Sequence, residues 1–376
     1  MIRILHTADL HLGAAFPTLG AREQQRREDF LATFTRIVDL AIAEKVELVL
    51  VAGDLFDRCD PDSGLVGFVQ GAFARLDDAG IGVVLLPGTH DHQLAGTGVY
   101  RRENFPTAVL LTDVQVATPV KLRVGREDVY LYGFAAGVAE EPAALLAGMR
   151  RRFDDGLHVG LLHGSLEGSP EWDYRGKDLP FALTDLQDWD LDYLALGHYH
   201  RFQELSLGGR LYGCYPGSPE GKRFGENGPR YVLLVEIGPR TASVRPVEIQ
   251  TRKLVEKTIE LEAGITGEAV ARMVEAAADC DDLVRLRLHG TLERALDIDW
   301  LTGRCRSAFF HLDLVDETRW LSDERLDELA REESVRGECV RRFRKLLRRT
   351  DDDEQRREIE QALREILVRF RIVEGR

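Results

Sequence analysis

The sequence predicts a layered α/β fold in its first two thirds, followed by a small α+β domain and a helical tail. Over the first 200 residues, short apolar runs alternate with segments of helical periodicity. Apolar runs of strand length that end at glycine or polar residues are typical of buried strands, and the helical segments between them are typical of layers that cover a sheet. We therefore expect a sandwich of sheets flanked by helices over residues 1–250.

Each element expected in this region has its own pattern. The runs IRILH, ELVLVAG and GVVLLPG, which begin at residues 2, 47 and 82, predict three strands, with one helix around residues 22–43 and a second before the third strand. Later strands are expected at VYLYGF, HVGLLHG, DYLALGH, RYVLLVEI and TASVRPVEI, between residues 129 and 249. Turn residues separate these runs, which supports short connections between strands.

The pattern changes near Thr251. The runs KLVEKTIEL, LVRLRLHG and FFHLDLV predict strands, and residues 265–278 have helical periodicity, so residues 251–318 are expected to form a small α+β domain. Residues 319–376 contain few strand formers and predict two helices. The second helix would place Ile359, Leu363, Ile366 and Phe370 on one face.

Composition excludes several classes of protein. The chain of 376 residues is 44% hydrophobic and carries a formal net charge of −14, which is typical of a folded protein and disfavours broad electrostatic binding to nucleic acid. Its five cysteines are scattered and form no CxxC pair, so neither a disulfide framework nor a zinc knuckle is expected. No long apolar run and no leader pattern occurs, so we expect a cytoplasmic protein that makes no contact with a membrane.

Side chains able to bind a metal follow five of the expected strands. They are Asp9 and His11, Asp54, His90 and Asp91, His163, and His198 with His200. Because the carboxyl ends of strands in α/β folds open on one edge of the sheet, these side chains are expected to meet there. Without His90 and Asp91, which are expected to be catalytic, six ligands remain, more than one catalytic ion takes, so the set predicts two divalent ions that share a carboxylate. Imidazole and carboxylate ligands without thiolate fit manganese, iron or zinc better than calcium. We expect manganese, with iron or zinc as alternatives.

These motifs carry a family resemblance. The series D-x-H at 9–11, G-D at 53–54, G-T-H-D at 88–91, His163 and G-H-x-H at 197–200 resembles that of the calcineurin-like metallophosphoesterases. Within that superfamily, ADLHLG, AGDLFD, LGHYH and YPGSPEGKRFGENG resemble the SbcD-type DNA repair exonucleases and their YhaO-like bacterial branch. The resemblance implies a metallophosphoesterase-type β-sandwich nuclease domain in residues 1–250, a capping domain in 251–318 and a partner-binding segment in 319–376.

The resemblance also implies roles for single residues. Asp9, His11 and His200 would hold the first ion, His163 and His198 the second, and Asp54 would bridge the two. Where the family usually has Asn in a GNHD motif this chain has Thr89, so the second ion would lose an amide ligand. His90 would assist the leaving oxygen, and Asp91 would hold His90 in orientation. Asp57 could hydrogen-bond a metal ligand, but a carboxylate that caps a turn explains it equally well, so it is not included among the expected site residues.

Three functions remain open from the sequence. The first is a DNA exonuclease or endonuclease in DNA repair that works with an SMC-like ATPase of the SbcC type, bound through the C-terminal helices, and that forms a homodimer as family analogues do. The basic segment RRFRKLLRR at 341–349 would touch DNA or an acidic partner, or would be a solvated helix face. The second is a phosphoesterase acting on a nucleotide, a small phosphodiester or a phosphoprotein. The third is a scaffold that has lost catalysis.

Overall fold

The computed structural model describes most of the chain and divides it into two compact units. The described residues are 1–92, 98–113, 116, 118–135, 142–171, 179–292, 296–319, 323–350 and 352–374. The first unit is Met1–Val255 and the second is Glu256–Arg376. None of the described helices is both long enough and apolar enough to cross a membrane.

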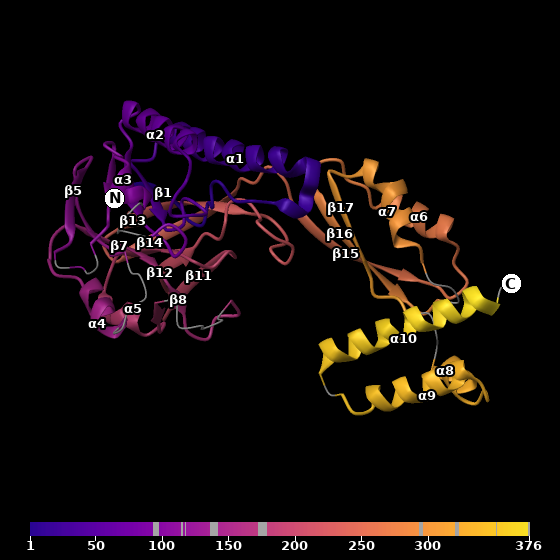
Figure 1. Ribbon diagram of the computed structural model, residues 1–376. Helices are drawn as coiled ribbons and strands as arrows, with labels where there is room; N and C mark the ends of the chain where they lie inside the picture. Colours follow the sequence, from indigo (N-terminus) through magenta and orange to yellow (C-terminus); the bar gives the residue numbers. More distant parts are fainter. Residues whose placement is uncertain are drawn as a thin grey trace. The chain divides into compact units, whose positions relative to one another are not determined.

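Two six-stranded sheets form the centre of the first unit (Figure 1). In the first sheet the order is β14 (Thr241–Glu248), β13 (Tyr231–Gly238), β1 (Ile2–Thr7), β2 (Leu48–Ala52), β3 (Gly82–Leu86) and β4 (Ala108–Leu110). In the second it is β11 (Gln203–Leu207), β12 (Arg210–Tyr215), β10 (Tyr193–Gly197), β7 (Leu157–His163), β6 (Glu127–Tyr132) and β5 (Val120–Val124). The strands β1 to β4 are parallel to one another, as are β6, β7, β10 and β12.

The two sheets share a core, which makes the first unit a β-sandwich. Side chains from both sheets, such as Leu50 and Val84 from one and Leu131 and Leu161 from the other, are fully buried in one cluster. A strand buried on both faces needs a continuous apolar run, and β2 with the sequence LVLVA is buried along its whole length. The predicted α/β sandwich flanked by helices is therefore confirmed.

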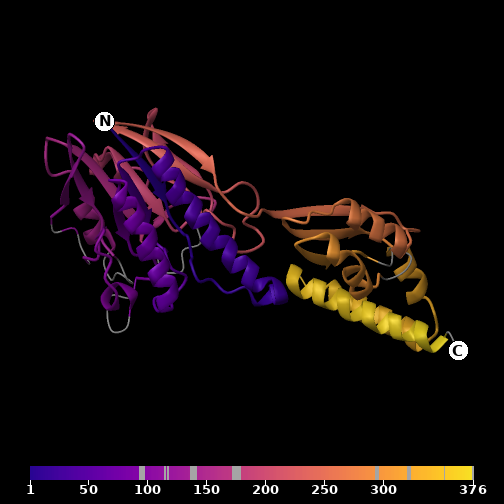
Figure 2. The same cartoon turned by 90° about the horizontal axis from the view of Figure 1, so that it is seen from above.

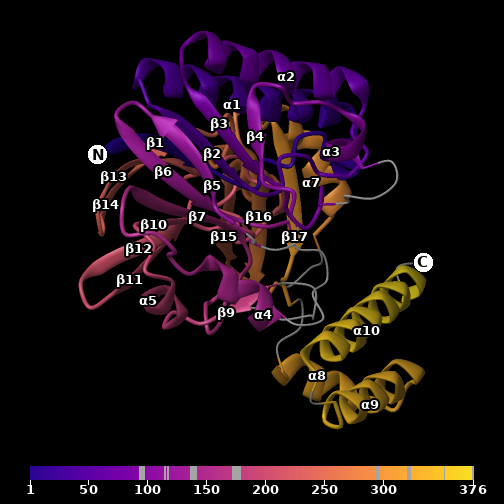
Figure 3. The same cartoon turned by 90° about the vertical axis from the view of Figure 1, so that its left-hand side faces the viewer.

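Helices cover the outer faces of this sandwich. Figure 3 shows α1 (Glu23–Ala43) and α2 (Ser63–Asp78) on the outer side of the first sheet, and α4 (Pro142–Leu146) and α5 (Asp185–Trp189) on the outer side of the second. The two long helices lie side by side in Figure 2 as well. Helix α2 begins at Asp62, whose carboxylate accepts a hydrogen bond from the Leu65 backbone N–H at 2.9 Å. The shorter elements are η1 (Pro17–Arg22), α3 (Val99–Arg102), η2 (Ala147–Met149), β8 (Ser165–Leu166) and β9 (Pro180–Phe181).

The second unit begins with a small three-stranded sheet. Its strands are β15 (Leu254–Leu261), which starts at the end of the first unit, β16 (Leu283–Gly290) and β17 (His311–Asp316), in that order. Two helices, α6 (Gly267–Ala276) and α7 (Ile298–Cys305), accompany the sheet, and η3 (Arg306–Ala308) follows α7. Both helices start at a capping side chain: Thr266 accepts from the Ala269 N–H, and Asp297 accepts from the Trp300 N–H.

The C-terminal segment contains three described helices, so the prediction of two is wrong. They are α8 (Asp323–Ala330), α9 (Val335–Leu347) and α10 (Asp353–Glu374). The chain turns after Ala330 because Ser334 caps a new helix, its hydroxyl accepting from the Gly337 N–H at 3.1 Å. On the described part of α10, Leu363 and Leu367 are buried in one cluster and Phe370 packs against it, so this cluster contains Leu363 and Phe370 of the predicted face.

Candidate metal centre

Backbone hydrogen bonds bring the loops that follow β1, β2, β7 and β10 together. The Asp9 N–H donates to the Gly53 carbonyl at 3.1 Å, and the His11 N–H donates to the Asp54 carbonyl at 3.0 Å. Between the two sheets, the His198 N–H donates to the carboxylate of Asp9, at 3.0 and 3.1 Å to its two oxygens. The candidate ligands that sequence places up to 191 residues apart therefore meet at one edge of the sandwich.

Four of the candidate ligands have unusual backbone conformations. The φ angles of Asp9, His11, Asp54 and His198 are 52°, 46°, 50° and 104°. Residues with a Cβ rarely occupy this region, and each such residue costs about 1–3 kcal/mol unless its surroundings hold it there. Backbone strain of this kind concentrates at functional sites, and here it falls on residues chosen from sequence as metal ligands.

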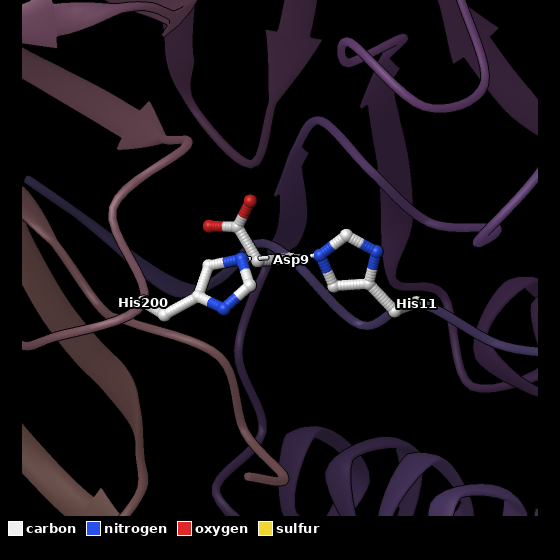
Figure 4. A group of neighbouring side chains, drawn as sticks. All are labelled: Asp9, His11 and His200. Carbon is white, nitrogen blue, oxygen red and sulfur yellow. Dashed lines mark hydrogen bonds between the residues drawn. The ribbon is translucent and has the colours of Figure 1, made fainter. Parts of the chain in front are cut away.

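One group of candidate ligands consists of Asp9, His11 and His200. An oxygen of Asp9 and one nitrogen of each imidazole all lie within 4.8 Å of one another. Figure 4 shows the rings of His11 and His200 turned toward each other near Asp9, with their Nε2 atoms 3.1 Å apart. Two imidazoles that approach through these nitrogens either share a proton or direct both lone pairs at a common cation.

A second group consists of Asp9, Asp54 and His163, all of them buried. The Nδ1 atom of His163 lies 3.0 Å from the Ala52 carbonyl, to which it can only donate, so Nε2 of the neutral ring keeps a lone pair. Within the described part of the chain this buried Nε2 makes no hydrogen bond; it lies 3.4 Å from Asp54 Oδ2. Beside two buried carboxylates this atom needs a positive charge, which a proton or a metal ion can supply, so these residues fit a metal ion.

Mutual attraction between His163 and Asp54 sets the electrostatics of this second group. Burial disfavours the charged form of both side chains, but the opposite charge of the partner outweighs burial. The pKa of His163 is therefore raised, and the pKa of Asp54 is held well below its usual range. The carboxylate of Asp54 is therefore ionised at neutral pH, the form that can bind a cation.

Two glycines allow the backbones around His163 to approach closely. A Cβ on Gly53, which has a φ of 97°, would lie 2.0 Å from His163 Nδ1. A Cβ on Gly197 would lie 1.9 Å from the Ala52 carbonyl oxygen. Both positions therefore require glycine, since any side chain would displace the imidazole or the strand that holds it.

The remaining predicted ligand of the second ion is His198. Its ring stands edge-on to the ring of His163, with centroids 5.2 Å apart. Thr89 contacts Asp54, the carboxylate predicted to be shared: its hydroxyl donates to Asp54 Oδ2 over a long 3.5 Å.

His90 lies at the rim of the centre. Its side chain is 44% exposed, its ring stands edge-on to His11 with centroids 4.7 Å apart, and its backbone N–H donates to Asp54 Oδ1 at 2.8 Å. The Nδ1 atom of His90 lies 3.0 Å from the Asp57 carbonyl. An exposed imidazole next to the buried ligands can reach a bound substrate.

Asp91 has partners different from those predicted. Instead of contacting His90, its carboxylate accepts from the Tyr100 hydroxyl at 2.7 Å, the Phe56 N–H at 3.0 Å and the Gly88 N–H at 2.7 Å. Consecutive side chains in a loop point in different directions, and that of Asp91 points inward, where burial raises its pKa to about 6. Asp91 therefore does not orient His90 as predicted; its carboxylate links the loops that follow β2 and β3.

Two further acids contact the candidate ligands, and Lys222 contacts one of these acids. Asp57 Oδ1 lies 3.2 Å from His11 Nδ1 and accepts a short hydrogen bond from the ammonium group of Lys222. Glu226 Oε1 lies 2.9 Å from His200 Nδ1, and this contact lowers the pKa of Glu226 to about 2 even though burial works in the opposite direction. Asp57 was visible in sequence as the second acid of GDLFD, whereas Lys222 and Glu226 lie in a loop whose position depends on the tertiary fold.

Comparison with known proteins identifies a family and several relatives that this chain resembles. The family of calcineurin-like phosphoesterases matches residues 2–202. An uncharacterized metallophosphoesterase of Bacillus subtilis (strain 168), YhaO, is 32% identical over 246 residues, which is 63% of this chain and 57% of that protein. The DNA double-strand break repair proteins Mre11 of Sulfurisphaera tokodaii and Haloferax volcanii are 30% and 29% identical over 266 and 289 residues, or 67% and 76% of this chain.

The chain spans 57% to 64% of the length of these three relatives. The family match covers more than half of the chain and contains every residue of the predicted metal centre. The chain therefore belongs to the calcineurin-like phosphoesterase family.

Proposed function

We propose that this phosphoesterase cleaves phosphodiester bonds of DNA with two divalent metal ions, of which manganese is the first choice and iron or zinc the alternatives. The observation that carries the proposal is the meeting of His11 Nε2, His200 Nε2 and the unpartnered His163 Nε2 around two buried carboxylates. Such an arrangement is hard to explain as a purely structural cluster, because it leaves buried polar atoms without partners.

The roles of the residues follow from their places. Asp9, His11 and His200 would hold one ion, His163 and His198 the other, and Asp54 would contact both. When bound, two such ions lower the pKa of a water molecule and neutralise the negative charge of the phosphodiester. His90 would give a proton to the leaving oxygen, because it is the most exposed imidazole beside the ligands and its Nδ1 is held by the Asp57 carbonyl.

DNA as the substrate is supported by the named activity of the relatives. Several are DNA double-strand break repair proteins, with identities near 30%. By the resemblance of the motifs to those of SbcD-type exonucleases, residues 251–318 would position the DNA strand, and the helices of residues 319–376 would bind an SMC-like ATPase. A cytoplasmic location and a homodimer complete this proposal.

A nucleotide or another small phosphodiester is the second candidate substrate. The net charge of −14 favours it, because a strongly negative protein attracts a long polyanion poorly. For DNA, the basic side chains at the end of α9, such as Lys345 in its last turn and Arg348 at its C-cap, would supply the local positive charge that binding requires.

Cleavage assays separate the two candidates. Purified protein with Mn²⁺ should degrade single- or double-stranded DNA, and His90→Ala should abolish cleavage while leaving Mn²⁺ binding intact. Turnover of bis-(p-nitrophenyl) phosphate without any DNA cleavage would favour the small phosphodiester. Cleavage that persists in His90→Ala would point to a contaminating nuclease or to a different proton donor.

A further inference from the structure

The imidazole of His200 is contacted on both of its nitrogens. Its Nε2 faces His11 Nε2 at 3.1 Å, on the side of the candidate metal centre. Its Nδ1, at the opposite edge of the ring, faces Glu226 Oε1 at 2.9 Å. A carboxylate can only accept, so Nδ1 carries the hydrogen and Nε2 keeps its lone pair.

Glu226 is itself held in place. Its second oxygen, Oε2, accepts from the Lys222 backbone N–H at 2.7 Å, so the carboxylate cannot rotate without losing one of two contacts. The side chain of Lys222 reaches Asp57, the acid beside His11. The loop thus links Glu226, the carboxylate next to His200, to Asp57, the carboxylate next to His11.

The start of the same loop is anchored in the protein interior. Glu220 is 1% exposed, and its carboxylate accepts from the Arg26 guanidinium at 2.6 Å and from the Thr33 hydroxyl at 2.7 Å. Both donors belong to α1. The loop of residues 220–226, which carries Glu226, is therefore held at its start by buried contacts to α1.

We infer that Glu226 is a positioning residue, which fixes the tautomer and the orientation of His200 so that Nε2 is ready to bind a metal ion. This inference rests on the metal centre of the proposed function. His163 achieves the same state through the Ala52 carbonyl, but a carboxylate also makes the imidazole a more basic ligand. If the hydrogen were on Nε2 instead, this nitrogen would have no lone pair to bind a cation.

Three substitutions in the full chain test the inference. Glu226→Ala removes the acceptor; Glu226→Gln keeps an oxygen that can accept from Nδ1–H; and Arg223→Ala removes the other charged contact of Glu226, an 81% exposed side chain 3.3 Å away. The affinity for Mn²⁺ is measured by isothermal titration calorimetry, and the melting temperature of each metal-free protein is recorded. Neither measurement depends on DNA cleavage.

The expected result is a loss of Mn²⁺ affinity in Glu226→Ala of roughly 10- to 100-fold, the scale found when a partner of a metal-binding histidine is removed. Glu226→Gln should recover part of that loss, and Arg223→Ala should bind like the wild type. An unchanged affinity in Glu226→Ala, or an equal loss in Arg223→Ala, would overturn the inference. So would an affinity in Glu226→Gln no better than in Glu226→Ala while both metal-free proteins melt like the wild type.

The outcomes for the proposed function are separate. A wild-type protein that binds Mn²⁺ but cleaves no DNA would refute the nuclease, while the role of Glu226 would still be decided by the affinities. A wild-type protein that binds no Mn²⁺ would overturn the metal centre, and the positioning role would fall with it.

Discussion

The buried histidine on β1 predicts how stability changes with pH. His6 is fully buried between the two sheets, with Nδ1 2.9 Å from the Tyr193 hydroxyl and Nε2 3.2 Å from the Leu196 carbonyl. A neutral ring with its hydrogen on Nε2 satisfies both partners, since Nε2–H donates to the carbonyl and Nδ1 accepts from the hydroxyl. Burial lowers the pKa of His6 from 6.5 to about 3.

The sign follows from proton linkage. The folded state keeps His6 neutral, while the unfolded chain protonates it below its ordinary pKa, so the folded state loses stability as the pH falls from 6.5 toward 3. At pH 5, about 1.5 pH units below the ordinary pKa, protonation of His6 in the unfolded chain lowers the unfolding free energy by about 2 kcal/mol.

The assay compares the wild type with His6→Gln, whose amide can also donate to the carbonyl and accept from the hydroxyl. Urea unfolding with EDTA present, followed by circular dichroism at pH 7.5 and pH 5.0, gives the loss of unfolding free energy for each protein. The other histidines titrate in both proteins and cancel in the comparison. The wild type should lose about 2 kcal/mol more than the variant. Equal losses would refute the reasoning.

Three further predictions concern the loop anchor, the glycine beside the centre and the metal. Glu220→Gln should lower the unfolding free energy, measured in urea, by about 3–5 kcal/mol, because it leaves the buried Arg26 without its main partner. Glu236→Gln, at an exposed ion pair, is the control. A loss below about 1 kcal/mol in Glu220→Gln would contradict the argument. Gly53→Ala should weaken Mn²⁺ binding at least about tenfold in calorimetry, because its Cβ would collide with the ring of His163; wild-type affinity would show that the loop can yield. Mn²⁺ at 100 times its dissociation constant should raise the unfolding free energy by about 2.7 kcal/mol for each ion bound, and EDTA should reverse the gain; an unchanged urea midpoint would mean that the folded chain binds no metal.

The parts of the fold that could be predicted from sequence are those where burial alone dictates the residues. β2 is buried along its whole length and is a continuous apolar run, whereas β7 is equally buried but includes His158 and His163. The hairpin of β11 and β12 was not predicted, because β11 has the sequence QELSL with only Leu205 fully buried. Its partner β12 lies beside β10, and the sequence does not show which strands are neighbours.

The candidate site shows the same division. Asp9 and Asp54 follow strands directly, so their approach to one another follows from the order of the parallel strands. Glu226 reaches His200 only because its loop is anchored on α1, and the inward direction of Asp91 is set by the donors of two other loops. Such contacts depend on loop paths, which no local pattern encodes.

The left-handed backbone at the ligands has a consequence for how the protein matures. Asp9, His11 and Asp54 lie within the first 54 residues, but the carboxylate of Asp9 is held by the N–H of His198. A chain that has emerged only as far as β3 has half of the six candidate ligands, and the His198 N–H that holds Asp9 is still missing. The set of candidate ligands is complete only after β10 has formed and the second sheet has packed on the first.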